Sequence, residues 1–565
     1  MSSSTRKSEV FTLADQVVER TCELSPITAT EFGVSGHDRE LDDFSPASRA
    51  NRLSLYDESL AALKRMSPKD GDDLVAQSVM RERLEASREL DLGGELDRTI
   101  GVISSPALAI REVFELMASS TPSDARTLAA RLRAVEHSLA TWRETLDALE
   151  GEGVALARRQ VVAVADQLRE IAGGGLLRMA SRLAASCGVD EHDSGLRDGA
   201  LAATKAFGET SQWLETVCAP RSVENSYVGR DRYETWCRYA LGTEVNLVET
   251  YEWGWAEMVR INERMWQLAH VLTPGAATLR EVADRLDSDP RLTVRGVDAI
   301  IERLRTFVEG AVERLDGREF TIDPRIRHCD VREAPEGTAA APYYRPPSED
   351  LSRPGTTWFP TRGREEFAWW TLPSIWYHEA VPGHHLQLGS IVINSSRLSR
   401  FQRLMGFTSA WAEGWALYAE RLAAELGFFE EPALEMGYLM SQSLRAARVV
   451  VDIGAHLQLR APRDFGELEG LGDVSRRRWD PEMMTETLVQ RALVSRDMAQ
   501  SEVERYLSLP AQAISYKVGE RAWLAVRDAE RSRQGESFSL RDFHDRALAL
   551  GPVSLADLAP LLASR

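Results

Sequence analysis

The sequence predicts a mainly α-helical protein with one short β segment. From Phe11 to about Val312, apolar residues return every three or four positions, the spacing that buries one face of a helix. Between Phe320 and Thr361, β-branched and aromatic residues alternate with prolines, so short strands and loops are expected there. The helical spacing resumes at about Arg364 and continues to the end. Its breaks are expected near Pro432, Pro462, Pro481, Pro510 and Pro552.

The first helical stretch shows the pattern most clearly between Leu128 and Trp142. No repeat of fixed period is found, which argues against a solenoid and favours an irregular helical lobe. Three parts of the chain are therefore expected: a disordered tail over residues 1–8, an N-terminal helical lobe over residues 9–315, and a second helical lobe over residues 316–565 that contains the β segment and the site described below.

The composition is that of a folded, water-soluble protein, with 43% hydrophobic and 27% charged residues. The formal net charge of -19 disfavours binding to nucleic acid or to anionic lipids unless a basic patch is present. The densest cationic run, residues 476–478, is short and is flanked by Asp473 and Asp480. Neither a nucleic-acid partner nor a membrane partner is expected.

Cysteine usage and the N-terminus suggest a location. The five cysteines are odd in number and far apart, which is typical of reduced thiols. The segment Met1–Glu9 is polar and rich in serine, without the apolar core of a secretory signal. No run of about 18 apolar residues occurs, the minimum for a membrane-spanning helix. A cytoplasmic location is expected.

Three of the ten histidines, His378, His384 and His385, fall within eight residues. In the familiar zincin arrangement, two histidines four residues apart on a helix bind one zinc ion, and the glutamate after the first histidine addresses the bound water. His378 and Glu379 form such a pair. The second histidine here follows six or seven residues later, about 9 to 10.5 Å further along an ideal helix, whereas two nitrogens on one zinc lie within about 4 Å.

Pro382 and Gly383 stand between these histidines and can resolve the conflict. Proline cannot donate a backbone hydrogen bond, and glycine adopts backbone angles closed to other residues. The pair is therefore suited to a break that folds the chain back. If the break forms, His384 joins His378 as a ligand; otherwise His385 is better aligned. The competing interpretation, satisfied histidines beside a helix end, must explain all these features at once.

A third ligand is expected on the helix that spans residues 409–422. Glu413 lies on its apolar side among Trp411, Gly414 and Trp415, where an unpaired carboxylate is costly and a metal would neutralise it. Glu420, two turns later, is either an alternative ligand or a partner that orients an imidazole. An ordinary helix-start carboxylate is the competing interpretation of Glu413.

The chain resembles a bacterial family known as a domain of unknown function, grouped with the gluzincin side of the zincin metallopeptidases. Its hallmark is His-Glu-x-x-Pro-Gly-His-His-x-Gln, which matches residues 378–387. The likeness extends over nearly the whole chain, through residues 42–46, 344–355, 413–420, 448–456 and 510–519. One departure is Ala511, because the family usually has Pro-Gly-Gln at residues 510–512.

The resemblance implies a large, irregular helical fold similar to the zincin metallopeptidases. It implies that His378, His384 and Glu413 hold zinc (Zn2+) and that Glu379 is the general base. The chain also looks like a distant relative of dipeptidyl peptidases whose His-Glu motif is one residue longer.

Further site residues are weighed from their chemistry. Tyr516 is the first candidate to donate to the oxyanion of the reaction, and His456 the second, although a core aromatic and a helix-end cation explain them equally well. Arg448 and Lys517 are candidates to bind a substrate carboxylate, with pairing of Arg448 to Asp452, four residues away, as the simpler alternative. The extended segment 355–360 could align a peptide as an added strand or be ordinary packing.

The function expected from these residues is zinc-dependent hydrolysis of a peptide or amide bond, with a small peptide or amide as the substrate. Two alternatives stay open. The first is a metal-dependent amidase that acts on a specialised metabolite. The second is a non-catalytic helical binding protein whose metal is structural or absent.

Overall fold

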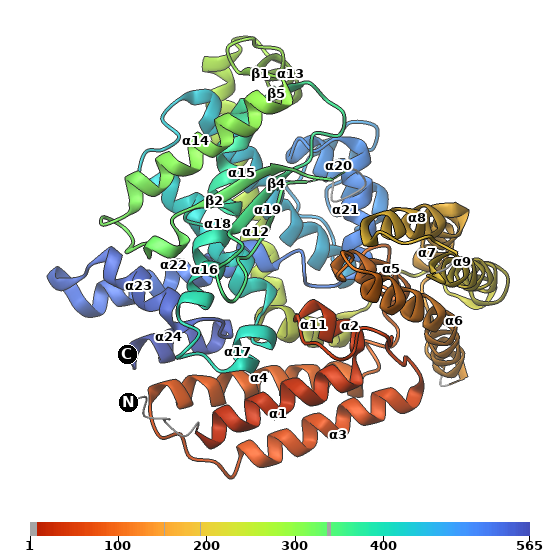
Figure 1. Ribbon diagram of the computed structural model, residues 1–565. Coiled ribbons are helices and arrows are strands. Elements are labelled where there is room, and N and C mark those ends of the chain that lie inside the picture. The colour runs from red at the N-terminus through yellow and green to blue at the C-terminus, as the bar shows by residue number, and fades with distance from the viewer. Residues whose placement is uncertain (1–7, 152, 193, 336–340, 565) are drawn as a thin grey trace. The chain divides into compact units, whose positions relative to one another are not determined.

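The computed structural model describes residues 8–151, 153–192, 194–335 and 341–564 (Figure 1). The predicted mainly α fold is confirmed, and the strands are few and short. The tail expected over residues 1–8 lies outside the described residues, except for Ser8. Ser8 caps the first helix, because its hydroxyl oxygen accepts a hydrogen bond of 3.1 Å from the backbone N–H of Phe11.

The chain forms two compact units. The first contains residues 1–67, 83–235 and 504–510, and the second contains residues 68–82, 236–503 and 511–565. Residues 236–315 thus belong to the second unit, so this division falls earlier in the chain than the expected boundary at residue 315.

The first unit is built from helices. Their bounds are α1 (Glu9–Leu24), α2 (Pro26–Glu31), α3 (Pro46–Leu63), α5 (Pro106–Leu116), α6 (Pro122–Gly151), α7 (Arg158–Glu170), a π-helical turn (Ile171–Gly175), α8 (Leu176–Cys187), α9 (Leu196–Trp213), a second π-helical turn (Leu214–Cys218) and α10 (Ala219–Arg221). The helix predicted from the spacing between Leu128 and Trp142 is part of α6, whose buried face packs on α9. Three helices contribute residues to both units: α4 (Gly71–Leu92), α11 (Arg230–Leu241) and α21 (Arg496–Ser508).

The second unit contains the strands and the remaining helices. Its helices are α12 (Leu247–Leu272), α13 (Leu279–Asp287), α14 (Val297–Leu315), α15 (Leu372–Glu379), α16 (His384–Ile393), α17 (Arg400–Met405), α18 (Ser409–Glu425), α19 (Pro432–His456), α20 (Pro481–Arg491), α22 (Ser515–Gln534), α23 (Leu540–Leu550) and α24 (Leu555–Ala563), with 3-10 turns at Pro324–Ile326, Trp369–Thr371 and Gly535–Ser537. Pro432 and Pro481 stand in the first turn of α19 and α20, where a missing N–H is tolerated.

The predicted β segment forms a three-stranded sheet of order β2-β4-β3, with β2 (Cys329–Glu333), β3 (Tyr343–Arg345) and β4 (Gly355–Phe359). Strand β4 is central, because Thr357 pairs in parallel with Val331 of β2 and antiparallel with Tyr344 of β3. The sheet packs on α14 and α16 (Figure 1). Two further antiparallel pairs lie outside the predicted segment: β1 (Thr293–Arg295) with β5 (Glu366–Ala368), and β6 (Glu467–Leu468) with β7 (Gly472–Asp473).

Glycines allow the helices that carry the site to approach closely. A Cβ atom on Gly414 of α18 would lie 2.4 Å from Cα of Gly519 in α22, and a Cβ atom on Gly519 would lie 2.3 Å from the carbonyl oxygen of Ala410. Because real Cβ atoms do not come this close, both positions require glycine. Helix α12 meets α19 in the same way, since a Cβ atom on Gly254 would lie 2.6 Å from Val449.

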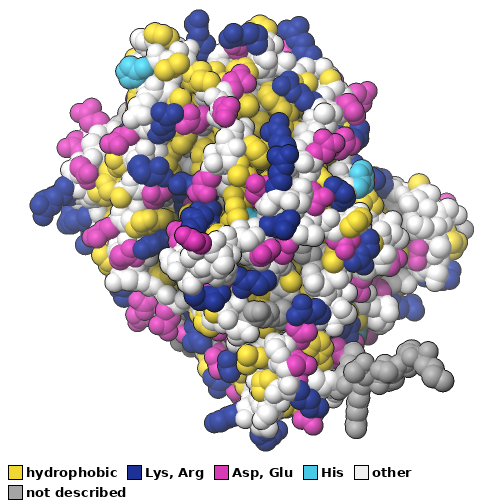
Figure 2. Space-filling model, turned by 90° about the vertical axis from the view of Figure 1, so that its left-hand side faces the viewer, with side chains coloured by type: hydrophobic (Ala, Val, Ile, Leu, Met, Phe, Trp, Pro, Cys, Tyr) yellow, Lys and Arg dark blue, Asp and Glu magenta, His cyan; other side chains and the backbone are white. Residues whose placement is uncertain are grey.

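The surface of the protein carries charges of both signs (Figure 2), and its cysteines are buried. On the face drawn in Figure 2, Lys and Arg side chains are interspersed with Asp and Glu side chains. All five cysteines lie within the described residues, are buried, and form no disulfide. Within the described residues no single helix has the length and apolar character to span a membrane, although α23 and α24, bent by 119°, meet that test as a pair.

Candidate metal centre

The first predicted ligand lies at the end of a helix, and the second begins the next one. Helix α15 ends at Glu379, and α16 starts at His384. The four residues between them include a cis Val381–Pro382 peptide bond. The carbonyl oxygen of Pro382 accepts a hydrogen bond of 2.9 Å from Nε1 of Trp415 in α18, which anchors the break. The chain therefore breaks at the predicted Pro382–Gly383 pair.

Gly383 is required by close contact within this break. A Cβ atom at this position would lie 1.8 Å from the carbonyl oxygen of His378. The φ angle of Gly383 is -73°, so a left-handed conformation is not the reason for glycine here. Its lack of a side chain lets the chain fold back over the last turn of α15, which carries His378 and Glu379.

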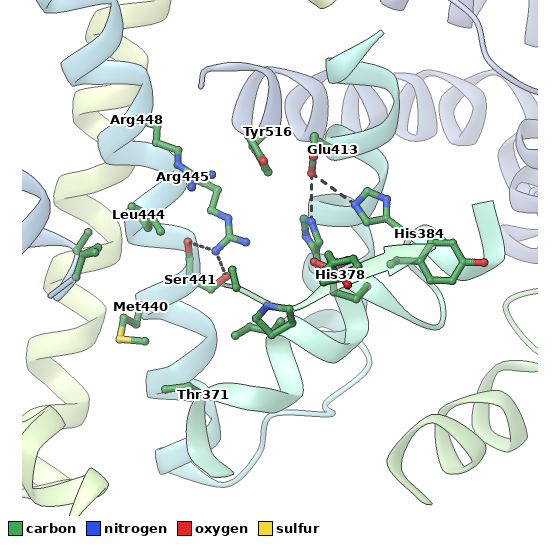
Figure 3. A pocket seen from close by; sticks show the side chains of 18 of the residues that line it. Thr371, His378, His384, Glu413, Met440, Ser441, Leu444, Arg445, Arg448 and Tyr516 are labelled. Atoms are coloured by element: carbon green, nitrogen blue, oxygen red, sulfur yellow. Dashed lines mark hydrogen bonds and ion pairs between the residues drawn. The ribbon is translucent and has the colours of Figure 1, made fainter. Parts of the chain in front are cut away.

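The fold-back brings together the three residues predicted as ligands (Figure 3). His378, His384 and Glu413 each offer a ligand atom, and these atoms all lie within 4.8 Å of one another. Oε2 of Glu413 is 3.2 Å from Nε2 of His378 and 3.6 Å from Nε2 of His384. Glu413 reaches them from the start of α18.

The donor set fits a zinc ion. Ligand atoms placed tetrahedrally about 2.1 Å from one zinc ion lie about 3.4 Å from each other. The separations from Oε2 of Glu413 to the two imidazole nitrogens, 3.2 and 3.6 Å, bracket that value, and the two nitrogens lie within 4.8 Å of each other. Two imidazoles and one carboxylate are also the ligand types of catalytic zinc sites that keep a fourth position open.

Glu420 orients His378 and does not approach the cluster as a ligand. Its Oε1 accepts a hydrogen bond of 2.9 Å from Nδ1 of His378, and its Oε2 accepts from the hydroxyls of Ser374 at 2.5 Å and Ser441 at 2.9 Å. The carboxylate is fully buried. Of the two roles considered for Glu420, the structure shows the orienting one. Nδ1 of His384 has no comparable partner among the described residues.

Charges within the cluster support one another. Burial lowers the pKa of His378, but its hydrogen bonds to Glu413 and Glu420 have a larger, opposite effect. The pKa is therefore raised to about 9. Burial raises the pKa of Glu413, and the two histidines more than reverse that effect, so it lies well below its usual range. Glu413 is therefore a carboxylate, the form that binds a cation.

His385 is turned away from the cluster. Its Nε2 donates a hydrogen bond of 2.7 Å to the carbonyl oxygen of Ile326, and its Nδ1 is 3.0 Å from the hydroxyl of Tyr344 in β3. Burial lowers its pKa to about 4. The alternative that placed His385 among the ligands is thus not what the structure shows. The residue ties α16 to the sheet beside it.

Glu379 stands beside the cluster in a pocket of about 650 Å³. The pocket is also lined by His378, His384 and Glu413. Within the described residues, the carboxylate of Glu379 makes no hydrogen bond. Burial raises its pKa above the usual value, and the two nearby histidines lower it less. A carboxylate with a raised pKa that faces a pocket is suited to accept a proton.

Tyr516 and Arg448 line the same pocket. The ring of Tyr516 is stacked on that of His378, with centroids 6.3 Å apart. The Arg448 guanidinium lies 4.6 Å from the centroid of the Tyr516 ring. Nε and Nη2 of Arg448 donate to Oε2 of Glu502 at 3.1 and 2.7 Å. An acid of the protein therefore pairs with Arg448, and this acid is supplied by α21.

His456 and Lys517 do not line the pocket. His456 is fully buried, with Nε2 3.6 Å from Oδ1 of Asp452, one turn earlier on α19. Lys517 is also buried, and its Nζ donates to Gln442 at 2.8 Å and to Glu520 at 2.5 Å. Both residues are held inside the fold, so the structure does not place either in contact with a substrate.

Arg445 also lines the pocket, although it is not among the site residues predicted from the sequence. It follows Ser441 by one turn of α19 and precedes Arg448 by three residues. Figure 3 shows its guanidinium across the pocket from His378 and Glu413. The sequence could have indicated Arg445, because residues three apart on a helix are neighbours and Arg448 was already a candidate.

Two further expectations concern backbone segments. Strand β4, expected as a surface for an added peptide strand, already pairs on both edges and cannot accept another strand. Ala511, at the position where the related family has glycine, is buried and has a φ of 65°. Its N–H donates to Asp452 at 3.0 Å. The left-handed backbone explains the family's glycine, and Ala511 does not line the pocket.

The fold and the site define a mainly helical protein with a His-His-Glu candidate metal centre in a pocket. The profile of a bacterial protein family of unknown function, DUF885, matches residues 26–562, and the chain belongs to this family. No curated protein matches the chain.

Two solved structures share the fold. "The putative lipoprotein from Colwellia psychrerythraea" is 21% identical, with a TM-score of 0.83 over 98% of each chain. "A putative lipoprotein of unknown function from Shewanella oneidensis" is 18% identical, with a TM-score of 0.75 over 99% of this chain and 100% of that chain. At these identities the likeness shows the fold alone.

The comparisons correct the expected location. Both of these solved structures are described as putative lipoproteins. The cytoplasmic location expected from the sequence is contradicted by this finding. The expectation depended on the composition of the first residues and on the number and spacing of the cysteines.

Proposed function

We propose that the protein is a zinc-dependent hydrolase that cleaves a peptide or amide bond of a small substrate. The observation that carries the proposal is the convergence of His378, His384 and Glu413 on the wall of a pocket that also holds Glu379. The order of these residues in the chain, His-Glu, then His, then Glu on a later helix, is similar to that of gluzincin metallopeptidases.

Each residue of the site has a part in this chemistry. His378, His384 and Glu413 would hold the ion, and Glu420 fixes His378 with Nε2 toward the cluster. When bound, zinc supplies Lewis acidity toward a carbonyl oxygen and lowers the pKa of water. The other steps are assigned to the protein's own side chains.

Glu379 is the proton carrier. It accepts a proton from a pocket water whose oxygen forms a bond to the carbonyl carbon of the substrate. The bond between that carbon and the amide nitrogen then breaks, and Glu379 returns the proton to the leaving nitrogen, so that an acid and an amine result. We assign the hydrogen bond to the developing oxyanion to Tyr516, because it lines the pocket and its ring stacks on that of His378.

The test is Glu379→Gln, measured for zinc content and for hydrolysis of a panel of short peptides and amides. We expect one zinc ion per chain in both proteins and a loss of about 10²- to 10⁴-fold in kcat for the variant. Glu366→Gln is the matched control, because Glu366 is exposed and pairs with Arg295. Absence of zinc, or an unchanged rate in Glu379→Gln, would contradict the proposal and favour a binding protein. Hydrolysis confined to non-peptide amides would indicate an amidase.

A further inference from the structure

One edge of the Arg445 guanidinium is unused. Its Nη1 donates to Oγ and to the carbonyl oxygen of Ser441 at 2.6 and 3.3 Å, both on its own helix. Its Nη2 comes no closer than 3.8 Å to Oε1 of Glu420. Its Nε has no hydrogen-bond partner among the described residues. A guanidinium carries five N–H donors in one plane, so most of those of Arg445 are not satisfied by the protein.

Arg448, in the same pocket, donates hydrogen bonds to a carboxylate of the protein. It lies three residues further along α19, and both Nε and Nη2 donate to Oε2 of Glu502. Its charge is therefore matched by an acid of the protein. Arg445 has no carboxylate within hydrogen-bond distance. The two arginines share a wall of the pocket and differ in whether a carboxylate accepts hydrogen bonds from them.

Glu420 cannot complete the pairing of Arg445 by itself. Its two oxygens already accept hydrogen bonds from His378, Ser374 and Ser441. Turning it toward Arg445 would release His378, which the metal site needs in one orientation. An unsatisfied, nearly buried guanidinium is costly, and a planar carboxylate is the group that matches its donors two at a time.

The rest of this wall is apolar. Met440 and Leu444 of α19 lie beside Arg445, and Leu493, Val494 and Met498 line the pocket with them. A cavity of about 650 Å³ suits a small molecule. The pocket thus combines a cation that lacks a hydrogen-bonded carboxylate, an apolar surface and the candidate metal centre.

We propose that Arg445 binds the carboxylate of the substrate, and that the substrates are N-acyl amino acids and short peptides whose free C-terminal carboxylate lies next to the scissile amide. An apolar side chain on the last residue would contact Met440, Leu444 and Val494. This inference rests on the proposed function and names its substrate class. It also moves the carboxylate-binding role from Arg448 to Arg445.

Binding measured without turnover tests the inference. The zinc-loaded Glu379→Gln protein is titrated by calorimetry with N-benzoylglycyl-leucine and with its C-terminal amide. We expect the free acid to bind about 10- to 100-fold more tightly, the range of a charge-assisted hydrogen-bonded pair. Adding Arg445→Gln should remove most of this preference. Arg445→Lys keeps the positive charge near Glu420 but not the planar donors, and should remove much of it as well.

Arg448→Gln in the same background is the matched control, and it should leave the ratio of acid to amide affinity unchanged. Equal affinities for acid and amide overturn the inference. So does an Arg445→Gln variant that weakens both probes alike, because Arg445 would then serve only to support Glu420. A preference that survives in both Arg445 variants also overturns it, since the carboxylate would be bound elsewhere.

Turnover of the two probes by the parent protein separates this inference from the proposed function. Hydrolysis of acid and amide at equal rates sinks the inference and leaves the hydrolase intact. An Arg445-dependent preference in binding with no hydrolysis of either probe supports the inference and contradicts the hydrolase. Circular dichroism of each variant confirms that the fold is retained.

Discussion

Oε1 of Glu420 accepts a hydrogen bond of 2.9 Å from Nδ1 of His378, and this contact decides which nitrogen of the imidazole faces the candidate metal centre. Nε2 is left 3.2 Å from Glu413, on the side of His384. The orientation is thus fixed from α18, the helix that also supplies Glu413.

Removal of the Glu420 charge is expected to weaken metal binding. Glu420→Gln keeps the shape of the side chain but weakens its hold on His378, so zinc affinity should fall by about 10- to 100-fold. Competition with a chromophoric chelator measures this loss. Glu425→Gln, at the end of the same helix and paired with Arg527, is the control and should bind zinc like the parent. Equal zinc affinities in all three proteins would show that Glu420 does not orient the ligand.

Gly383→Ala is expected to disrupt the break between α15 and α16. Its Cβ would lie 1.8 Å from the carbonyl oxygen of His378, so the chain must shift where His378 and His384 meet. We expect zinc binding to be lost and the free energy of unfolding to fall by about 1–3 kcal/mol. Gly310→Ala in α14 meets no atom within 4 Å and should raise the free energy of unfolding by up to about 1 kcal/mol. If Gly383→Ala keeps the zinc affinity of the parent, the close contact between residue 383 and the carbonyl oxygen of His378 is not needed for the metal site.

Ala511→Gly is expected to stabilise the protein. Ala511 has a left-handed φ of 65°, a conformation that costs an L-residue about 1–2 kcal/mol. Glycine removes this cost, but part of the gain is lost because glycine increases the conformational entropy of the unfolded chain. The free energy of unfolding in urea should rise by up to about 1 kcal/mol. Ala513→Gly is the matched control at a buried position of the same loop without positive φ, and it should be destabilising. A destabilised Ala511→Gly protein would speak against backbone strain at this residue.

His544 predicts a loss of stability in acid. Nδ1 donates to the carbonyl oxygen of Glu319 and Nε2 accepts from the hydroxyl of Tyr418, both at 2.7 Å, so the ring is held neutral. Burial lowers its pKa to about 3. Below pH 6.5 His544 binds a proton in the unfolded chain but not in the folded chain. The free energy of unfolding is therefore highest above about pH 6.5 and decreases toward pH 3.

At pH 5 the expected loss from His544 is about 2 kcal/mol. Urea unfolding between pH 4 and 7 measures this loss. In His544→Gln, the slope of the unfolding free energy against pH should decrease by an amount that corresponds to up to about one proton. The His544 ring signal in NMR should not titrate near pH 6.5. A midpoint near that value would show that the ring is not held neutral.

The fold class and the approach of His384 to His378 could be predicted from the sequence because both depend on local patterns. The spacing of apolar residues predicts helices, and Pro382–Gly383 predicts the break that lets His384 approach His378. The end of α15 and the start of α16 could not be predicted, because they depend on Trp415 of another helix, which holds the carbonyl of Pro382.

The remaining site residues depend on contacts between distant segments. Arg448 forms an ion pair with Glu502 of α21, which lies 54 residues later in the chain. Lys517 follows Tyr516 directly, and neighbours on a helix point about 100° apart, so the two could not share one pocket wall. That geometry was available from the sequence, whereas the burial of Lys517 against Glu520 and Gln442 was not.

The central claim is that His378, His384 and Glu413 bind one zinc ion. Anomalous diffraction at the zinc edge from crystals of the zinc-loaded protein tests it most directly. We predict a single strong peak about 2.0–2.2 Å from Nε2 of both histidines and from a carboxylate oxygen of Glu413, with His385 outside the coordination sphere. A peak at another group of residues, or none at this cluster, would contradict the account.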